Sequence, residues 1–266
     1  MDFHLDGKTA YITGGAAGIG AAIADRLSAE GVRLAVADHD GAALEEAGRR
    51  WAVPGDPVLV EADLSTASGV AYACQAVLDG FGGRAPDIVV NNVALCVSRE
   101  FDDIDDAAWD LTFQLNFMSY VRTCRTLAPA MAAAPDDASI VNIASDLAKQ
   151  PDTVPIDYGS MKSAVLHLSK ALSRKYAPAL RVNSVLPGPV WTGLWSRPGG
   201  IADKLAELYG TDRDAAVDRY LKDRQLDLGL AEPDEVATMV AYLASPLSRR
   251  ISGSAFDIGG TIHGLY

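Results

Sequence analysis

Residues 9–31 read TAYITGGAAGIGAAIADRLSAEG and contain three successive structural signals. The run 9–13 is short and apolar, as a buried β-strand is. A glycine-rich turn follows, and from Gly20 onward Ile23 and Leu27 mark one stripe of a helix. A strand that passes through a tight turn into a helix is the first half of a strand–helix–strand unit. The opening of the chain therefore predicts an α/β fold built on a parallel sheet.

The same alternation of β-type and helical stretches continues to the end of the chain. The β-type runs are mostly apolar rather than strictly alternating, which indicates that helices cover both faces of the sheet. We expect a single domain over residues 1–266, with an about seven-stranded, doubly wound parallel sheet. The predicted strands are 9–13, 33–38, 57–63, 87–92, 139–145, 181–187 and 254–260, and the predicted helices are 20–31, 65–80, 105–133, 156–177 and 233–245.

One segment, residues 189–228, interrupts this alternation before the last helix and strand. It runs from PVWTGLWSRPGG to KLAELYGTDRDAAVDRYLKDRQLDL and has helical character. An insertion that follows the carboxyl end of a strand lies where open α/β sheets bind their ligands. We expect a small helical lid over a substrate, and the alternative is an extension that serves only packing.

The composition excludes several classes of protein. The 266 residues are 49% hydrophobic, and 23 basic against 35 acidic residues give a net charge of −12, which disfavours nucleic acid and anionic membranes as partners. No apolar run approaches the ~20 residues that span a bilayer, and the N-terminus has no signal-peptide pattern. Cys74, Cys96 and Cys124 are odd in number and widely spaced. The sequence predicts a cytoplasmic protein in which all three cysteines are buried and reduced, with no metal site.

The glycine-rich turn, Thr13 to Gly20, reads TGGAAGIG. Its glycines permit a tight turn and a close approach of the backbone to a phosphate group. Free N–H groups at the start of the following helix would then bind the pyrophosphate of a dinucleotide. The spacing is G-x-x-x-G-x-G rather than the commoner G-x-G-x-x-G, but the position between a strand and a helix strengthens the prediction.

Asp38 ends the second predicted strand, 18 residues after Gly20. A carboxylate at this position accepts hydrogen bonds from the adenosine ribose hydroxyls and repels a 2′-phosphate. Its neighbours His39 and Asp40 supply no arginine for such a phosphate. The sequence therefore favours NAD as the cofactor, with NADP as the weaker candidate. The alternative role for Asp38 is to cap the next helix.

Tyr158 and Lys162, in the stretch DYGSMK, stand four residues apart at the start of a predicted helix. Four residues make about one helical turn, so the two side chains lie on the same face. Such pairs arise often by chance, and the pair alone does not indicate chemistry. Its meaning depends on the motifs around it.

Taken together, the motifs resemble the short-chain dehydrogenase/reductase family over nearly the whole chain. TGGAAGIG resembles the family's dinucleotide-binding turn, and Tyr158-x-x-x-Lys162 resembles its catalytic pair. Ser145 stands 13 residues before Tyr158, as the family's catalytic serine does, and Asn116 matches the asparagine of its long central helix. The resemblance implies a Rossmann-type fold. Further segments match in the family's order: NNVA (91–94), LPGPVWT (186–192) and FDIGG (256–260).

The resemblance also implies roles for four side chains in the interconversion of an alcohol and a ketone. Tyr158 would be the general acid/base that exchanges a proton with the substrate oxygen while a hydride moves to or from the nicotinamide. Lys162 would lower the tyrosine pKa from its usual value of roughly 10 and bind the nicotinamide ribose. Ser145 would hold the substrate oxygen towards Tyr158. Asn116 would anchor a water that leads from Lys162 to solvent.

The cofactor contacts follow from the resemblance as well. Asp63 and Leu64 would lie around the adenine, and Asn91 would lie near the adenosine ribose. Val190 and Thr192 would lie near the carboxamide. The implied cofactor-binding residues are Gly14, Gly18, Ile19, Gly20, Asp38, Asp63, Leu64, Asn91, Tyr158, Lys162, Val190 and Thr192.

Two residues depart from the family pattern. Ala94 stands where the family's Asn-Asn-Ala-Gly has its glycine, and it adds a methyl group near the cofactor or the substrate mouth. Asp146 places an acid directly after Ser145. This acid either contacts a polar substrate group or is a solvated loop carboxylate.

The implied substrate pocket includes Val97, Leu147, Ile156, Trp191 and Trp195. This mostly apolar lining favours a medium-sized secondary alcohol or ketone with a hydrophobic body. Aromatic rings also stack on sugar faces, and Arg99 or Arg197 would suit an acid group, so a polyol and a hydroxy acid stay open.

The sequence thus predicts an NAD-dependent oxidoreductase that interconverts a secondary alcohol and a ketone. The alternatives are an NADPH-dependent ketoreductase similar to 3-oxoacyl reductases, a polyol or sugar dehydrogenase, and an NAD-sensing protein without activity. The complete Ser145, Tyr158 and Lys162 set disfavours the last. The resemblance implies a homotetramer, or a homodimer, formed through helices 105–133 and 156–177.

Overall fold

The computed structural model describes residues 2–51, 55–134, 137–226 and 228–259. Its centre is one seven-stranded sheet in the order β3-β2-β1-β4-β5-β6-β7, and every neighbouring pair is parallel. The predicted doubly wound parallel sheet is therefore confirmed. The strands are β1 (Thr9–Thr13), β2 (Arg33–Asp38), β3 (Val58–Glu61), β4 (Ile88–Asn91), β5 (Ala138–Ile143), β6 (Leu180–Pro187) and β7 (Ala255–Ile258). Residue 260 of the last predicted strand lies outside the described residues.

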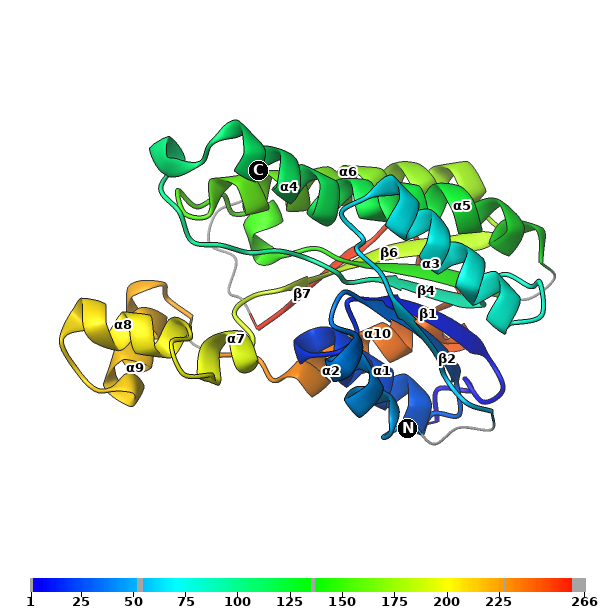
Figure 1. Cartoon of the computed structure of the whole chain (residues 1–266), viewed down its shortest axis with the longest axis horizontal. Helices are drawn as coiled ribbons and strands as arrows, with labels where there is room; N and C mark the ends of the chain where they lie inside the picture. Colours follow the sequence, from blue (N-terminus) through cyan, green and yellow to red (C-terminus); the bar gives the residue numbers. More distant parts are fainter. Residues whose placement is uncertain (1, 52–54, 135–136, 227, 260–266) are drawn as a thin grey trace.

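Helices cover both faces of the sheet, as Figure 1 shows. One layer holds α1 (Gly18–Ala29), α2 (Gly41–Gly48) and α10 (Pro233–Ala244), and the other holds α3 (Ala67–Gly80), α4 (Asp106–Phe113), α5 (Ser119–Ala133) and α6 (Ile156–Tyr176). The sequence did not predict α2. This helix is short and contains glycines, and the side chain of Asp40 stabilises its first turn by accepting a hydrogen bond from the Ala43 N–H.

The strands are apolar throughout because the two helical layers bury both of their sides. Tyr11 and Val89 point into the hydrophobic cluster under α3 and α5, whereas Ile12 and Val90 point into the cluster under α1 and α10. Successive side chains of a strand face opposite sides, so neighbouring residues belong to different clusters. Full burial of one such aliphatic side chain contributes about 1.5–3 kcal/mol.

The predicted helix 105–133 is interrupted in the structure. A π-helical turn, Gln114–Met118, separates α4 from α5 and contains Asn116. Asn116 is fully buried, and its amide forms two hydrogen bonds with the backbone of Leu95. The wider turn breaks the regular helical pattern where this side chain enters the core. Such turns occur frequently at functional sites.

The segment after β6 forms three short helices, α7 (Gly193–Ser196), α8 (Ile201–Tyr209) and α9 (Arg213–Asp223). Figure 1 shows them projecting from the end of the sheet where β6 ends. The helical character predicted for this segment is therefore present. None of the helices in the described ranges is long and apolar enough to cross a membrane.

Candidate active site

The two central strands, β1 and β4, lead into one crevice at the carboxyl edge of the sheet. The chain connections run in opposite directions on either side of these strands, and open α/β sheets bind ligands at such a point. The hydroxyl of Thr13 accepts hydrogen bonds from the N–H groups of Asn92 and Val93, at 3.0 and 3.2 Å. The Asn92 amide donates to the carbonyl of Gly14 at 2.8 Å. Thr13 thus supports the turn, and Asn92, which sequence reasoning missed, ties it to β4.

The glycine-rich turn needs its glycines for two reasons. Gly14 and Gly18 have φ angles of +68° and +57°, which side chains other than glycine rarely adopt. A Cβ atom on Gly20 would lie 2.0 Å from the carbonyl oxygen of Gly14, and one on Gly15 would lie 2.3 Å from Val36. The first turn of α1 carries neither a side-chain cap nor an acidic residue. This cradle fits the pyrophosphate of a dinucleotide.

Asp38 lies at the end of β2, and its side chain is turned back towards the glycine-rich turn. One carboxylate oxygen accepts a 3.0 Å hydrogen bond from the N–H of Ala16, and the other accepts one of 3.2 Å from the N–H of Asp40. The imidazole of His39 lies 3.0 Å from the same carboxylate. Asp40, and not Asp38, caps α2. The capping role considered for Asp38 is therefore excluded.

The remaining predicted cofactor residues occupy different environments. Asp63 is exposed, and hydrogen bonds from Ser65 hold the pKa of its carboxyl below the usual value. Leu64 is buried beside it. Val190 and Thr192 line the same cavity as Ile19, and Thr192 would lie 3.7 Å from a Cβ atom on Gly18. The segment after β6 thus reaches the glycine-rich turn.

The side chain of Asn91 is buried and hydrogen-bonded within the protein. Its amide nitrogen donates to Asn142 of β5 at 2.8 Å, and its side-chain oxygen is buried without a partner among the described residues. Only 1% of the residue is exposed. The side chain therefore lies inside the sheet layer and not on the surface of the crevice.

Ser145, Tyr158 and Lys162 meet at the wall of the crevice. Ser145 caps the short 3₁₀ turn Asp146–Ala148 after β5, and Tyr158 and Lys162 lie in the first turns of α6. The ammonium of Lys162 lies 5.5 Å from the centre of the Tyr158 ring. Each of the three side chains lines the same cavity.

Lys162 is almost completely buried and has two neutral partners. Its Nζ donates to the carbonyl oxygen of Ile143 at 2.8 Å and to the hydroxyl of Tyr120 at 3.0 Å. The Tyr120 hydroxyl donates in turn to Ile143 at 3.0 Å. Sequence reasoning missed Tyr120. Its position four residues after Asn116 places both on one helical face, which was the available signal.

The electrostatics of the pair differ from the sequence-based expectation. Burial lowers the pKa of Lys162 to about 7. Burial also raises the pKa of Tyr158 well above its usual value, and the neighbouring Cys96 and Asp146 act in the same direction, while the hydrogen bond between Tyr158 and Ser145 opposes them. The expectation was that Lys162 lowers the tyrosine pKa. In the protein alone, loss of solvation is the largest influence, and the tyrosine pKa rises instead.

The hydroxyl of Ser145 is engaged with its neighbour in the chain. It donates a 2.8 Å hydrogen bond to Oδ1 of Asp146, and the N–H of Leu147 donates to both side chains, at 3.2 Å to Ser145 and 2.8 Å to Asp146. Burial raises the pKa of the Asp146 carboxyl. Asp146 is half-buried, so the structure does not place it as a solvated loop carboxylate.

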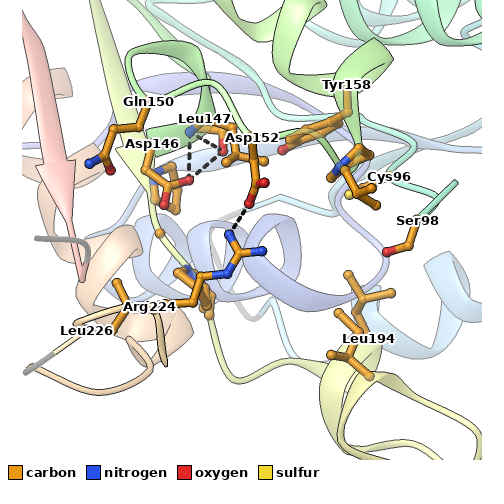
Figure 2. Close-up of a pocket in the computed structure, with 18 of the residues that line it drawn as sticks. Cys96, Ser98, Asp146, Leu147, Gln150, Asp152, Tyr158, Leu194, Arg224 and Leu226 are labelled. Atoms are coloured by element: carbon orange, nitrogen blue, oxygen red, sulfur yellow. Dashed lines mark hydrogen bonds and ion pairs between the residues drawn. The ribbon is translucent and has the colours of Figure 1, made fainter. Parts of the chain in front are cut away.

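The cavity has a volume of about 1020 Å³ and extends from the crevice to α7–α9. Of the predicted pocket residues, Leu147 and Trp195 line it, whereas Val97, Ile156 and Trp191 do not. Residues next to these three in the chain line the cavity instead: Cys96, Ser98, Pro155, Val190 and Thr192. Ala94 also lines it. Figure 2 shows that Asp146, which the sequence analysis named, belongs to a polar side of the cavity together with three residues that it did not name: Gln150, Asp152 and Arg224. Arg224, at the end of α9, forms an ion pair with Asp152.

Comparisons with known proteins agree with this architecture. A family model described as enoyl-(acyl carrier protein) reductase matches residues 14–263. D-Threitol dehydrogenase of Mycolicibacterium smegmatis is 32% identical over 98% of this chain and 94% of its own length. (3R)-3-Hydroxyacyl-CoA dehydrogenase of Mus musculus is 28% identical over 97% of this chain and 96% of its own length. L-Sorbose reductase of Gluconobacter frateurii, solved with NADPH and L-sorbose, is 29% identical and superposes with a TM-score of 0.91 over 100% of both chains.

The match covers nearly the whole chain and includes the sheet order, the glycine-rich turn and the Tyr158-x-x-x-Lys162 pair. These relatives are dehydrogenases and reductases that act on CH–OH groups. The protein therefore belongs to the NAD(P)-dependent short-chain dehydrogenase/reductase family of oxidoreductases.

Proposed function

We propose that this protein is an NAD-preferring dehydrogenase that oxidises a secondary alcohol to a ketone and catalyses the reverse reaction, with Tyr158 as general acid/base. One observation carries the proposal: Ser145, Tyr158 and Lys162 line a single cavity that also reaches the glycine-rich turn through Ile19 and Thr192. A bound dinucleotide and the oxygen of a substrate can thus lie next to each other in one cavity.

In this proposal Tyr158 accepts the proton of the substrate hydroxyl, and Ser145 donates a hydrogen bond to the same oxygen. When bound, NAD supplies the hydride acceptor and a positive ring whose charge favours the phenolate form of Tyr158. Lys162 holds the nicotinamide ribose and returns the proton towards solvent. Asn116 fixes the backbone at Leu95, and its proposed role is to position the loop that borders the water path.

The preference for NAD rests on the charges around Asp38. Its carboxylate lies at the end of β2 with Asp40 next in the turn, and the imidazole of His39 lies 3.0 Å from it. A 2′-phosphate would meet net negative charge there. The alternative is an NADPH-dependent ketoreductase, which the NADPH in the sorbose reductase structure favours.

We further propose that residues 189–228 act as a substrate lid on a single domain that spans residues 1–266. The support is that Trp195, Tyr220 and Arg224, all from this segment, line the cavity. The ring of Trp195 lies against Tyr220 with 5.3 Å between centroids, which joins α7 to α9. The lid would exclude water during the proton and hydride transfers.

A homotetramer, or a homodimer, in the cytoplasm completes the proposal. Leu111 and Phe113 of α4 are exposed at 43% and 37%, which supports association through the layer of α4–α6. The three cysteines are unpaired, which supports a reducing compartment, and Cys96 is exposed although the sequence predicted that all three are buried. Light scattering after gel filtration tests the assembly.

Reduction of NAD and NADP with a panel of secondary alcohols tests the central proposal. The panel includes aliphatic alcohols, hydroxy acids, and polyols such as threitol. Tyr158→Phe removes the proton acceptor, and we expect kcat to fall by ~10²–10⁴-fold. Tyr72→Phe, at an exposed position of α3, is the matched control and keeps full activity. Normal turnover by Tyr158→Phe would exclude Tyr158 as the general acid/base.

A further inference from the structure

The carboxylate of Asp146 is hydrogen-bonded to the hydroxyl of Ser145, the residue directly before it in the chain. Its Oδ1 accepts from the Ser145 hydroxyl and the Leu147 N–H, both at 2.8 Å. Within the described ranges Oδ2 has no hydrogen-bond partner, and it is not among the atoms sealed from solvent. Figure 2 shows Asp146 among the side chains that surround the cavity. One carboxylate oxygen is thus open to a ligand.

The proton of Ser145 is needed in two places. A serine hydroxyl has one proton to donate, and in the structure it goes to Asp146. The proposed function requires the same proton at the substrate oxygen, where negative charge develops as Tyr158 removes the hydroxyl proton. A substrate with a single hydroxyl must therefore compete with Asp146 for Ser145.

We propose that Asp146 selects substrates that carry a second hydroxyl next to the reacting carbon, namely vicinal diols and α-hydroxy ketones of the polyol and ketose type; this rests on the proposed function. The second hydroxyl donates to Oδ2 of Asp146, which makes Oδ1 a weaker acceptor, so that the proton of Ser145 turns to the reacting oxygen. No covalent bond changes in this exchange. The neighbouring oxygens of a diol lie about as far apart as two hydrogen-bonded oxygens, ~2.8 Å, which matches the distance between Ser145 Oγ and Asp146 Oδ1.

The rest of the cavity has both polar and apolar surface, which suits such a substrate. Gln150 and the Asp152–Arg224 ion pair supply hydrogen-bonding groups beyond Asp146. Leu194 and Trp195 supply apolar surface for the carbon skeleton. Polyols present both hydroxyl edges and C–H faces, and sites that bind them combine these two kinds of surface.

A purely structural role for Asp146 makes a different prediction. Ser145 already caps the 3₁₀ turn by accepting from the Leu147 N–H, so Asp146 duplicates that contact. If Asp146 only stabilised the turn, its replacement would reduce activity equally for every substrate. The ratio between a diol and its single-hydroxyl analogue separates the two roles.

The test compares kcat/KM for two matched pairs, 2,3-butanediol with 2-butanol and 3,4-hexanediol with 3-hexanol, using wild type, Asp146→Asn, Asp146→Ala and the exposed control Asp102→Asn. We expect the wild type and the control to prefer each diol by at least about tenfold. Both Asp146 variants should lose this preference through a lower diol kcat/KM, and their activity with 2-butanol should stay equal or rise because Ser145 is released.

A binding measurement keeps the test independent of turnover. In the Tyr158→Phe background with NADH, acetoin should raise the melting temperature more than 2-butanone does, and Asp146→Ala should abolish the difference. Equal losses of kcat/KM for diols and single alcohols, or a diol preference that survives in Asp146→Ala, would overturn this inference and leave the proposed function in place. Absence of turnover with every alcohol of the panel would instead overturn the proposed function.

Discussion

The ammonium of Lys162 donates a 3.0 Å hydrogen bond to the hydroxyl of Tyr120, and both groups meet at the carbonyl oxygen of Ile143. Both partners of this buried lysine are neutral, and no described carboxylate forms an ion pair with it. The arrangement explains why burial lowers the pKa of Lys162 to about 7. The protein therefore holds Lys162 close to the point where this side chain changes charge at physiological pH.

Tyr120→Phe tests whether this hydroxyl positions the lysine. The change keeps the ring but removes one of two acceptors for a buried ammonium, so we expect kcat/KM to fall about tenfold and the free energy of unfolding to fall by about 1–3 kcal/mol. The control is Tyr72→Phe, which removes an exposed hydroxyl. Loss of this acceptor should lower the pKa of Lys162 further, and the pH dependence of kcat/KM should shift with it. An unchanged pH profile together with unchanged kcat/KM would exclude the positioning role.

Lys162→Met tests the stability cost of the buried charge. The pKa of Lys162 is about 7 in the folded protein against 10.5 for the ordinary side chain. Between these values the unfolded chain binds one more proton, so this lysine makes stability rise with pH from about 7 to 10.5. Below pH 7 the lysine is protonated in both the folded and the unfolded chain, so the free energy of unfolding is reduced by the full cost of burying the ammonium.

We therefore expect Lys162→Met to be inactive yet more stable than the wild type at pH 7, by up to a few kcal/mol, with the gap closing towards pH 10. Urea denaturation across this pH range measures it. Lys170→Met, at an exposed position of α6, should show no such trend. A gap that does not change with pH would contradict the lowered pKa.

Asp38→Asn tests the basis of cofactor preference. Asparagine keeps an oxygen that accepts from the Ala16 N–H, so the glycine-rich turn should remain folded. Loss of the negative charge weakens binding of the ribose hydroxyls and removes repulsion of a 2′-phosphate. The ratio of kcat/KM for NAD to that for NADP should fall at least about tenfold. Asp40→Asn, which changes a neighbouring charge, is the control, and an equal shift there would assign the preference to net charge alone.

The sequence was most informative where local pattern and family motif coincide. β1 and β2 begin and end at the predicted residues, because their apolar runs are bounded by glycines and charged residues. Ser145, Tyr158 and Lys162 share one cavity, as the motif spacing implied. In each case the information lies within a few residues of the chain or in the order of the motifs.

Features that depend on contacts between distant segments were not predictable in this way. Tyr120 becomes a partner of Lys162 only because a π-helical turn and α6 pack against each other. Asn91 turns into the sheet layer because Asn142 of the neighbouring strand supplies an acceptor. Arg224 reaches the cavity from a separate helix. Helical periodicity places Tyr120 on the face of Asn116, but neither propensity nor periodicity identifies the partners of these side chains.

An ion pair between Arg224 and Asp152 joins the end of α9 to the segment before α6, and both residues line the cavity. Both side chains are partly exposed, at 42% and 26%, so the pair adds little to global stability, about 0–1 kcal/mol. Its effect should fall on the position of α7–α9. Because this segment contributes Trp195 and Tyr220 to the cavity lining, its loosening should weaken substrate binding.

We expect Arg224→Met and Asp152→Asn each to raise KM by about three- to tenfold with little change in kcat, and the double variant to be no worse than either single one. Arg219→Met, an exposed arginine of the same helix, is the matched control and should keep the wild-type KM. High salt screens a partly exposed pair, so the wild-type KM should rise towards that of the variants as ionic strength increases. Additive effects in the double variant would show that the two side chains act separately, and the pair would then not hold the lid.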